Sequence, residues 1–258
     1  MTILQTIILG IVEGVTEFLP VSSTFHLVWT AKLLGLEQTD SQKLFEIAIQ
    51  SGAILAVGIG FIKTSLKNIE IIKKVFAAFI PTAIIGFALY KVIKNVFLEN
   101  LPLQLCMFIA IGIVFILFEM FSKRSYTRTM ADITYKEALF VGVAQALAVV
   151  PGVSRSGAVI IALMMLSVKR EDAATFSFLL AVPTILAATA LDLLKSHTAI
   201  QSAHDAALLA VGFIASFVVA LVVVRWFITY LQRHTISIFG WYRIALGIIL
   251  ALVLIGQA

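Results

Sequence analysis

The segment EGVTEFLPVSSTFH, residues 13–26, places acids, hydroxyls and a histidine around one proline. Glu13 and Glu17 are four residues apart, so a helix would put both carboxylates on one face. Two neighbouring acids can hold a divalent cation such as Mg²⁺ or Ca²⁺, because these ions take oxygen ligands. Alternatively, one acid stays protonated and serves as an acid or base. A third reading is a pair of side chains that simply reach water.

Two serines and a histidine follow Pro20. Ser22 and Ser23 are residue types that cap a new helix, and the free N–H groups and dipole at a helix start attract anions. His26 lies three residues after Ser23 and can share its helix face. A hydroxyl beside an imidazole is the minimal pair for nucleophilic catalysis. The spacing therefore predicts such a pair at this break, although capping alone would also explain the serines.

A second segment, PGVSRSG at residues 151–157, repeats the combination of proline, small residues and hydroxyls. Arg155 carries a forked, permanently charged group that suits phosphate oxygens. Glycine lets the backbone approach a ligand closely, and serine supplies hydroxyls. The residues of this kind that we predict to contact a ligand are Gly152, Ser154 and Ser156. An alternative is that Arg155 only pairs with one of the two glutamates as a structural ion pair.

The elements around these residues are apolar. Of 258 residues, 61% are hydrophobic and 13% charged, against about 45–50% and 25% in soluble domains. We predict an all-α polytopic membrane protein, residues 1–258 forming a single transmembrane domain. About 20 apolar residues cross a bilayer, and six uninterrupted runs qualify: 45–62, 75–93, 103–121, 175–194, 206–230 and 241–256. Lys and Arg lie mostly in short connections, so no nucleic-acid partner is predicted.

Two further apolar stretches, residues 1–36 and 138–166, are broken in the middle. Pro20 interrupts the first, and Pro151 with Gly152 interrupts the second. Proline removes a backbone donor and clashes with the preceding turn, so each stretch should form two half-helices. Irregular backbone is tolerated at membrane depth only where protein or water surrounds it. We therefore predict two re-entrant hairpins of broken helices.

The two halves of the chain resemble each other at an offset of 131 residues. This offset places Pro20 on Pro151 and Ser23 on Ser154. An internal duplication would bring related breaks to one place in the fold. The two repeats would cover about residues 1–121 and 138–256.

The distribution of positive charge predicts the orientation of the two repeats. Loops 63–74 and 122–137 are rich in Lys and Arg and should be cytoplasmic. Counting spans from these loops, the first hairpin enters from outside and the second from the cytoplasm. This is an inverted repeat, in which the broken hairpins meet near the membrane midplane and form the site.

At these motifs the sequence resembles the undecaprenyl-diphosphate phosphatase (BacA/UppP) family of bacterial membrane proteins. The segments EGVTEFLPVSSTFH and PGVSRSG carry the resemblance, and FEIAIQSGAILAV, FSFLLAVPTILAATALDLLK and YRIALG support it. The resemblance covers essentially the whole chain. One departure is Phe25, because the family usually has glycine between the threonine and the histidine of the first motif. The pocket should be reshaped at this position.

The resemblance implies removal of the terminal phosphate from undecaprenyl diphosphate, which recycles the cell-wall lipid carrier and confers bacitracin resistance. It implies Ser23 as candidate nucleophile, His26 as its base or as an alternative nucleophile, and Arg155 as the diphosphate clamp. The acidic pair would bind the divalent cation or shuttle protons. Secondary phosphate contacts would come from Ser22, Ser154 and Ser156.

Hydrolysis needs water, and the first hairpin enters from outside, so the active site should open to the outer face of the bacterial inner membrane. A transporter or flippase of the same lipid carrier is the alternative, because inverted repeats with broken helices are also a transporter architecture. A transporter would need Arg155, but not a Ser23 hydroxyl aligned with His26. The sequence leaves a homo-oligomer open. Trp241 and Tyr242 are predicted as interfacial anchors.

Overall fold

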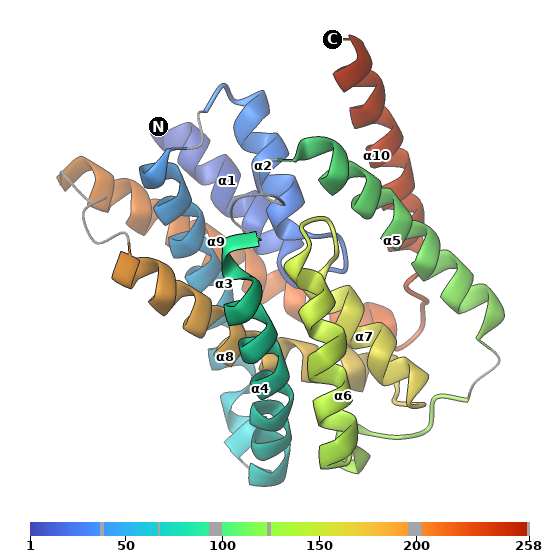
Figure 1. The fold of residues 1–258 in the computed structure, drawn as a ribbon. Coiled ribbons are helices and arrows are strands. Elements are labelled where there is room, and N and C mark those ends of the chain that lie inside the picture. The colour runs from blue at the N-terminus through green and yellow to red at the C-terminus, as the bar shows by residue number, and fades with distance from the viewer. Residues whose placement is uncertain (37–38, 67, 93–99, 123–124, 196–202, 257–258) are drawn as a thin grey trace.

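A computed structural model describes residues 1–36, 39–66, 68–92, 100–122, 125–195 and 203–256 of the chain. These residues form α-helices and short 3-10 turns and contain no named strand (Figure 1). The helices are α1 (Ile3–Thr16), α2 (Ser23–Leu33), α3 (Asp40–Leu66), α4 (Ile69–Val92), α5 (Leu101–Phe121), α6 (Tyr135–Ala146), α7 (Arg155–Met165), α8 (Arg170–Lys195), α9 (Ala203–Leu231) and α10 (Ser237–Gly256).

Six of these helices are long and apolar enough to cross a membrane: α3, α4, α5, α8, α9 and α10. The all-α class and the six spans predicted from the sequence are therefore confirmed for the described residues. The spans agree with the apolar runs within a few residues. The largest difference is at α4, which begins at Ile69 rather than at residue 75.

The four remaining helices form two hairpins, α1 with α2 and α6 with α7 (Figure 1). They have 14, 11, 12 and 11 residues, fewer than the roughly 20 that a spanning helix needs. Each hairpin turns at its proline, as expected. The re-entrant placement of the hairpins in a membrane and the inverted repeat stay predictions.

Local sequence explains where the hairpin helices begin. Thr2 and Gln5 form a capping box at the start of α1, each side chain accepting from the other residue's backbone N–H. Thr134 and Glu137 form the same arrangement at the start of α6. These caps satisfy N–H groups that have no partner inside the helix, so both outer ends of the hairpins are well defined.

Small residues let the hairpins approach the long helices closely. A Cβ at Gly14 of α1 would lie 2.6 Å from the carbonyl oxygen of Ser216 on α9, and one at Gly142 of α6 would overlap the backbone of Ala78 on α4. Close backbone approach through small residues is the usual way that helices pack in lipid. The α1–α9 and α4–α6 contacts therefore fix both hairpins against the long helices.

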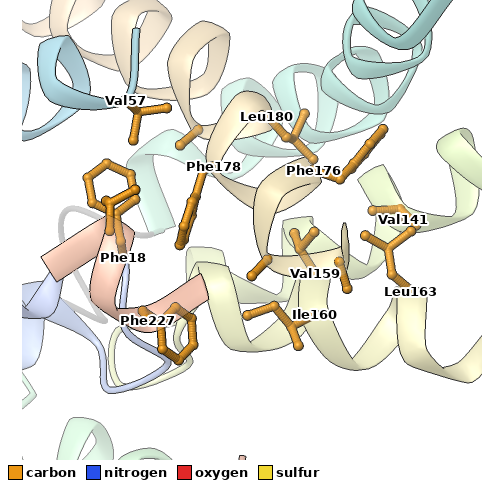
Figure 2. Packing of buried hydrophobic residues seen from close by; sticks show 14 of the residues in the cluster. Phe18, Val57, Val141, Val159, Ile160, Leu163, Phe176, Phe178, Leu180 and Phe227 are labelled. Atoms are coloured by element: carbon orange, nitrogen blue, oxygen red, sulfur yellow. The ribbon is translucent and has the colours of Figure 1, made fainter. Parts of the chain in front are cut away.

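The largest hydrophobic cluster lies directly beside the broken segments. Phe18, next to the first break, packs edge-on against Phe178 of α8 with ring centroids 5.1 Å apart. Val159 and Ile160 of α7 belong to the same buried cluster, as Figure 2 shows. This packing holds both hairpins against α8 and leaves little freedom to the polar residues between them.

Candidate active site

The breaks of the two hairpins are in contact. Ser156 at the start of α7 donates a hydrogen bond to the carbonyl oxygen of Leu19 at 3.0 Å. The guanidinium of Arg155 lies 2.9 Å from Oε1 of Glu17. The meeting of the two breaks predicted from the sequence is thus confirmed, and it brings polar residues of both halves into one buried cluster.

Ser23 is the first residue of α2 and is buried. Its hydroxyl donates to Oε2 of Glu17 across 2.5 Å. A short hydrogen bond between a hydroxyl and a carboxylate is charge-assisted and stronger than one between neutral groups. Glu17 therefore binds Ser23 with one oxygen and Arg155 with the other, so the carboxylate is positioned to take the serine proton.

His26 does not complete the predicted pair with Ser23. Its Nδ1 is 2.8 Å from the carbonyl oxygen of Ser22, and its Nε2 is 2.7 Å from the hydroxyl of Tyr242. Both ring nitrogens are therefore engaged elsewhere. The sequence spacing suggested a shared helix face, but the imidazole bends back over the first turn of α2 instead. The partner of the Ser23 hydroxyl is Glu17.

Glu13 lies one helical turn before Glu17 and is fully buried. Neither of its carboxylate oxygens accepts a hydrogen bond from a donor group. The Glu17 carboxyl lies close enough to share a proton with Glu13, and the charges of Glu17, Glu46 and Arg155 act on it. A buried carboxylate without partners is unfavourable unless a proton or a cation compensates it. In the described part of the chain, no group of three or more His, Cys, Asp or Glu residues could hold a metal. A cation here would need other oxygen ligands.

The second break is organised by its own hydroxyls. Ser154 caps α7 by accepting from the backbone N–H of Gly157 at 3.2 Å, and its Oγ lies 3.0 Å from Oγ of Ser156. Arg155 also donates to the carbonyl oxygen of Ser177 on α8 at 3.3 Å. The structural ion pair weighed for Arg155 is thus present with Glu17. These contacts also hold the guanidinium at the site.

Ser22 and Gly152 occupy the turns of the two hairpins, and both have unusual backbone conformations. Ser22 has φ 67° and Gly152 has φ 92°, a region that residues other than glycine rarely adopt. The Ser22 side chain makes no cap hydrogen bond. Close approach was predicted at Gly152, and it occurs toward α5: a Cβ there would lie 2.5 Å from the carbonyl oxygen of Gln104.

Arg243 of α10 holds the backbone of both breaks, a role that was not predicted from the sequence. It is fully buried, and its guanidinium donates to three carbonyl oxygens, those of Pro20, Gly152 and Phe108. It therefore joins both breaks to α5. The signal was an arginine inside an apolar run, which is rare in membrane helices and marks a functional or structural site.

Phe25 occupies the position where the resembling family usually has glycine. The residue lies within α2, outside the positive-φ region, and its ring stacks on Phe108 at 3.9 Å between centroids and 10° between planes. It also packs edge-on against His26. Phe25 therefore needs no glycine-like backbone, and it reshapes the site by filling the space between α2 and α5.

These features define a class: an all-helical, multi-pass membrane protein with a buried serine and carboxylate and a partly buried guanidinium at two helix breaks. Within that class, the chain belongs to the family described as Bacitracin resistance protein BacA, whose model matches residues 6–249. The family resemblance noted in the sequence is confirmed.

Three relatives illustrate how far the similarity extends. The chain is 46% identical to the undecaprenyl-diphosphatase of Aquifex aeolicus over 252 residues, 97% of this chain and 98% of that protein. It is 49% identical over 254 residues to the undecaprenyl-diphosphatase of Persephonella marina, with 98% and 99% covered. The undecaprenyl-diphosphatase of Methanococcus aeolicus is 40% identical over 252 residues, with 97% and 98% covered.

Proposed function

We propose that this chain hydrolyses undecaprenyl diphosphate to undecaprenyl phosphate and inorganic phosphate. The hydrogen bond from Ser23 to Glu17 at 2.5 Å carries the proposal, because it pairs a nucleophile with a proton acceptor at a buried site. Relatives named undecaprenyl-diphosphatase that align over nearly the whole chain support it. Recycling of this lipid carrier would place the chain in cell-wall synthesis and, as the family description indicates, in bacitracin resistance.

The reaction follows from the two residues that face each other. The Ser23 oxygen attacks the terminal phosphorus while its proton moves to Glu17. The bond between that phosphorus and the bridging oxygen breaks, and undecaprenyl phosphate leaves with the bond electrons. Glu17 gives this proton to the departing phosphate. Water then attacks the phosphoserine, and Glu17 takes a proton from this water and returns it to the Ser23 oxygen as the bond between that oxygen and phosphorus breaks. Inorganic phosphate is the second product, and the serine is regenerated.

The anionic head group would be bound by Arg155 and by the starts of two helices. Both α2 and α7 begin beside the site, at Ser23 and Arg155. A helix start presents N–H groups and a partial positive charge to anions. Arg155 contacts Glu17, and a phosphate oxygen would replace Glu17 as the partner of the guanidinium. Secondary contacts are proposed for Ser22, Ser154 and Ser156.

A divalent cation fits the unpartnered carboxylate of Glu13. Glu13 and Glu17 would hold Mg²⁺ or Ca²⁺ together with oxygens of the substrate. When bound, the ion would supply positive charge that offsets the diphosphate and stabilises the leaving phosphate. Glu17 would offer Oε1 to the ion after Arg155 releases this oxygen, while Oε2 keeps its contact with the Ser23 hydroxyl.

The prenyl chain would lie in an apolar groove beside the second hairpin. The groove has a volume of about 480 Å³ and runs between α5, α6 and α7. Val150 and Val153, which flank Pro151 and Gly152, line its end near the break. A chain that leaves the diphosphate at the break would enter apolar surroundings immediately. An entirely hydrocarbon tail requires such surroundings.

The membrane orientation is proposed from packing and charge. Helix α1 of the first half packs on α9 of the second half. Helix α6, the counterpart of α1 at the 131-residue offset, packs on α4 of the first half. The α5–α6 and α7–α8 connections pair through backbone hydrogen bonds between Arg128 and residues Ser167 and Lys169. These basic connections gather at one end, which we assign to the cytoplasm. The first hairpin then opens to the outer face of the inner membrane.

The test is phosphate release from undecaprenyl diphosphate by the detergent-purified chain. Ser23→Ala should abolish release, whereas Ser51→Ala should not, because the Ser51 hydroxyl donates to the Ile47 carbonyl within its own helix. Both variants should keep the wild-type thermal midpoint. A folded wild type that binds the lipid but releases no phosphate would contradict the proposal and favour a transporter of the same lipid.

A further inference from the structure

Tyr242 of α10 reaches His26 of α2 across a sequence separation of 216 residues. Its hydroxyl is 2.7 Å from Nε2 of the imidazole, and the two rings are nearly parallel, with 7° between their planes. The tyrosine is 43% exposed, so its ring alone could serve as an anchor at a membrane surface. The hydroxyl, however, points at a residue of the first hairpin. This contact is more specific than anchoring requires.

The hydrogen bonds assign the protonation of the imidazole. Nδ1 faces the carbonyl oxygen of Ser22 at 2.8 Å, and a carbonyl oxygen can only accept. Nδ1 therefore carries the hydrogen. In a neutral imidazole the other nitrogen is then an acceptor, so Tyr242 donates to Nε2. In this arrangement Nε2, the one acceptor nitrogen of the His26 ring, accepts from the Tyr242 hydroxyl and is not available to another donor.

The carbonyl that His26 holds belongs to a strained residue. Ser22 has φ 67° and ψ 92°, and such a backbone conformation is unfavourable for residues other than glycine. The same carbonyl also accepts from the backbone N–H of His26 at 3.3 Å. The next residue is Ser23, whose hydroxyl donates a hydrogen bond to the carboxylate of Glu17. His26 therefore stabilises the turn that directs the nucleophile.

We propose that Tyr242 is a positioning residue: it fixes the tautomer of His26, which holds the Ser22 carbonyl and so keeps Ser23 on Glu17. His26 acts through the backbone and does not take the serine proton. The inference rests on the proposed phosphatase function, but it concerns different residues. Two adjacent residues of α10 then hold the first break: Arg243 binds the Pro20 carbonyl before the turn, and Tyr242 binds His26 after it.

The first test is Tyr242→Phe in the full chain, which removes one oxygen and keeps the ring. Loss of one positioning hydrogen bond should lower kcat about three- to tenfold and leave KM for the lipid diphosphate nearly unchanged. Tyr135→Phe is the matched control, because the Tyr135 hydroxyl bonds to Glu70 away from the site. A kcat for Tyr242→Phe equal to that of the control would overturn the proposal.

A pair of His26 variants separates positioning from proton transfer. In His26→Asn the side-chain N–H lies near the place of Nδ1 and can still donate to Ser22, whereas in His26→Gln it lies near the place of Nε2. The proposal predicts that Asn keeps at least about tenfold more activity than Gln. Equal loss in both variants, at wild-type thermal midpoints, would instead support His26 as the base and contradict the proposal.

The tautomer gives a readout independent of activity. The ¹⁵N chemical shifts of the His26 ring, identified as the signals missing in His26→Asn, should show Nδ1 protonated in the wild type. In Tyr242→Phe they should move toward a mixture of tautomers. A ring protonated at Nε2 in the wild type would contradict the inference. The proposed function is judged separately, because it depends on phosphate release by the wild type and its loss in Ser23→Ala.

Discussion

At the scale of single residues, the nucleophile and the charged groups of the site have defined hydrogen-bond partners, with one exception. Ser23 and Arg155 both bind Glu17, so the nucleophile and the phosphate ligand are held by the carboxylate that accepts the proton. Glu13 is the exception, since its buried oxygens have no hydrogen-bond partner. This asymmetry between two glutamates one turn apart fits different main roles: Glu17 takes the serine proton, and Glu13 contributes a free carboxylate to the cation that both would hold.

Glu13→Gln tests the cation role. Glutamine keeps the size of the side chain but removes the charge that attracts an ion, so the free Mg²⁺ concentration for half-maximal activity should rise by about 10- to 100-fold. The measurement is phosphate release in chelator-buffered Mg²⁺. Glu70→Gln is the control, because Glu70 is exposed and paired with Lys73. An unchanged Mg²⁺ dependence in Glu13→Gln would count against the cation site.

Residue types and spacing predicted much of this cluster. The proline breaks and their polar neighbours identified Ser23, Glu17 and Arg155, which the structure brings together. The pairing of Ser23 with His26 was not found, because the imidazole bonds to the Ser22 carbonyl and to the Tyr242 hydroxyl instead. Tyr242 could not be placed from sequence, since its contact with His26 depends on how α10 packs against α2.

At the scale of elements, the two breaks are rigid because they press against long helices. Gly152 lies where a side chain would meet the backbone of α5, and its carbonyl accepts from Arg243. The first break is held by the same guanidinium through Pro20. Sequence predicted the positions of both breaks but not their attachment to α5. That attachment depends on the crossing of α5 and α10 at Gly112 and Gly240.

Gly152→Ala should therefore destabilise the whole second break. The new methyl group would overlap the carbonyl of Gln104, and φ 92° is unfavourable for alanine. We expect a loss of at least about 2 kcal/mol, seen as a lower thermal midpoint and reduced activity. Gly86→Ala is the matched control, since nothing lies within 4 Å of a Cβ there. Equal thermal midpoints for the two variants would contradict this packing account.

The groove between α5, α6 and α7 gives a prediction about chain length. Ala158→Phe should fill part of the groove and raise KM for undecaprenyl diphosphate by about tenfold, because a prenyl chain would lose apolar contact there. KM for a diphosphate with a short prenyl chain should change little. Val222→Phe, on an exposed part of α9, is the control. Equal effects on long and short chains would argue against the groove as the tail site.

At the scale of the whole molecule, the two halves are similar in helices but not in chemistry. At the offset of 131 residues, Glu13 and Glu17 correspond to Ala144 and Ala148. Only the first hairpin therefore carries acids next to its break, and the two breaks together hold one acidic pair rather than two. A single acidic pair fits a hydrolase that acts on lipid from one leaflet of the membrane. The orientation of the first hairpin in the membrane is therefore worth testing directly.

Orientation can be measured with single cysteines introduced after Cys106→Ala. In intact cells, Thr39→Cys, beside the first hairpin, should react with a membrane-impermeant thiol reagent. Gln232→Cys, between α9 and α10, should react only after the membrane is permeabilised. Both variants should release phosphate at the wild-type rate. The reverse labelling pattern would place the first hairpin on the cytoplasmic side.

The most direct test of the account is to trap the phosphorylated enzyme. Wild-type protein would be mixed with excess undecaprenyl diphosphate, quenched within one turnover in neutral detergent, digested and analysed by mass spectrometry. Because the Ser23 hydroxyl donates to Glu17 and His26 is engaged with Ser22 and Tyr242, we expect phosphate on Ser23. Phosphate on His26, or turnover without any phosphoenzyme, would contradict it.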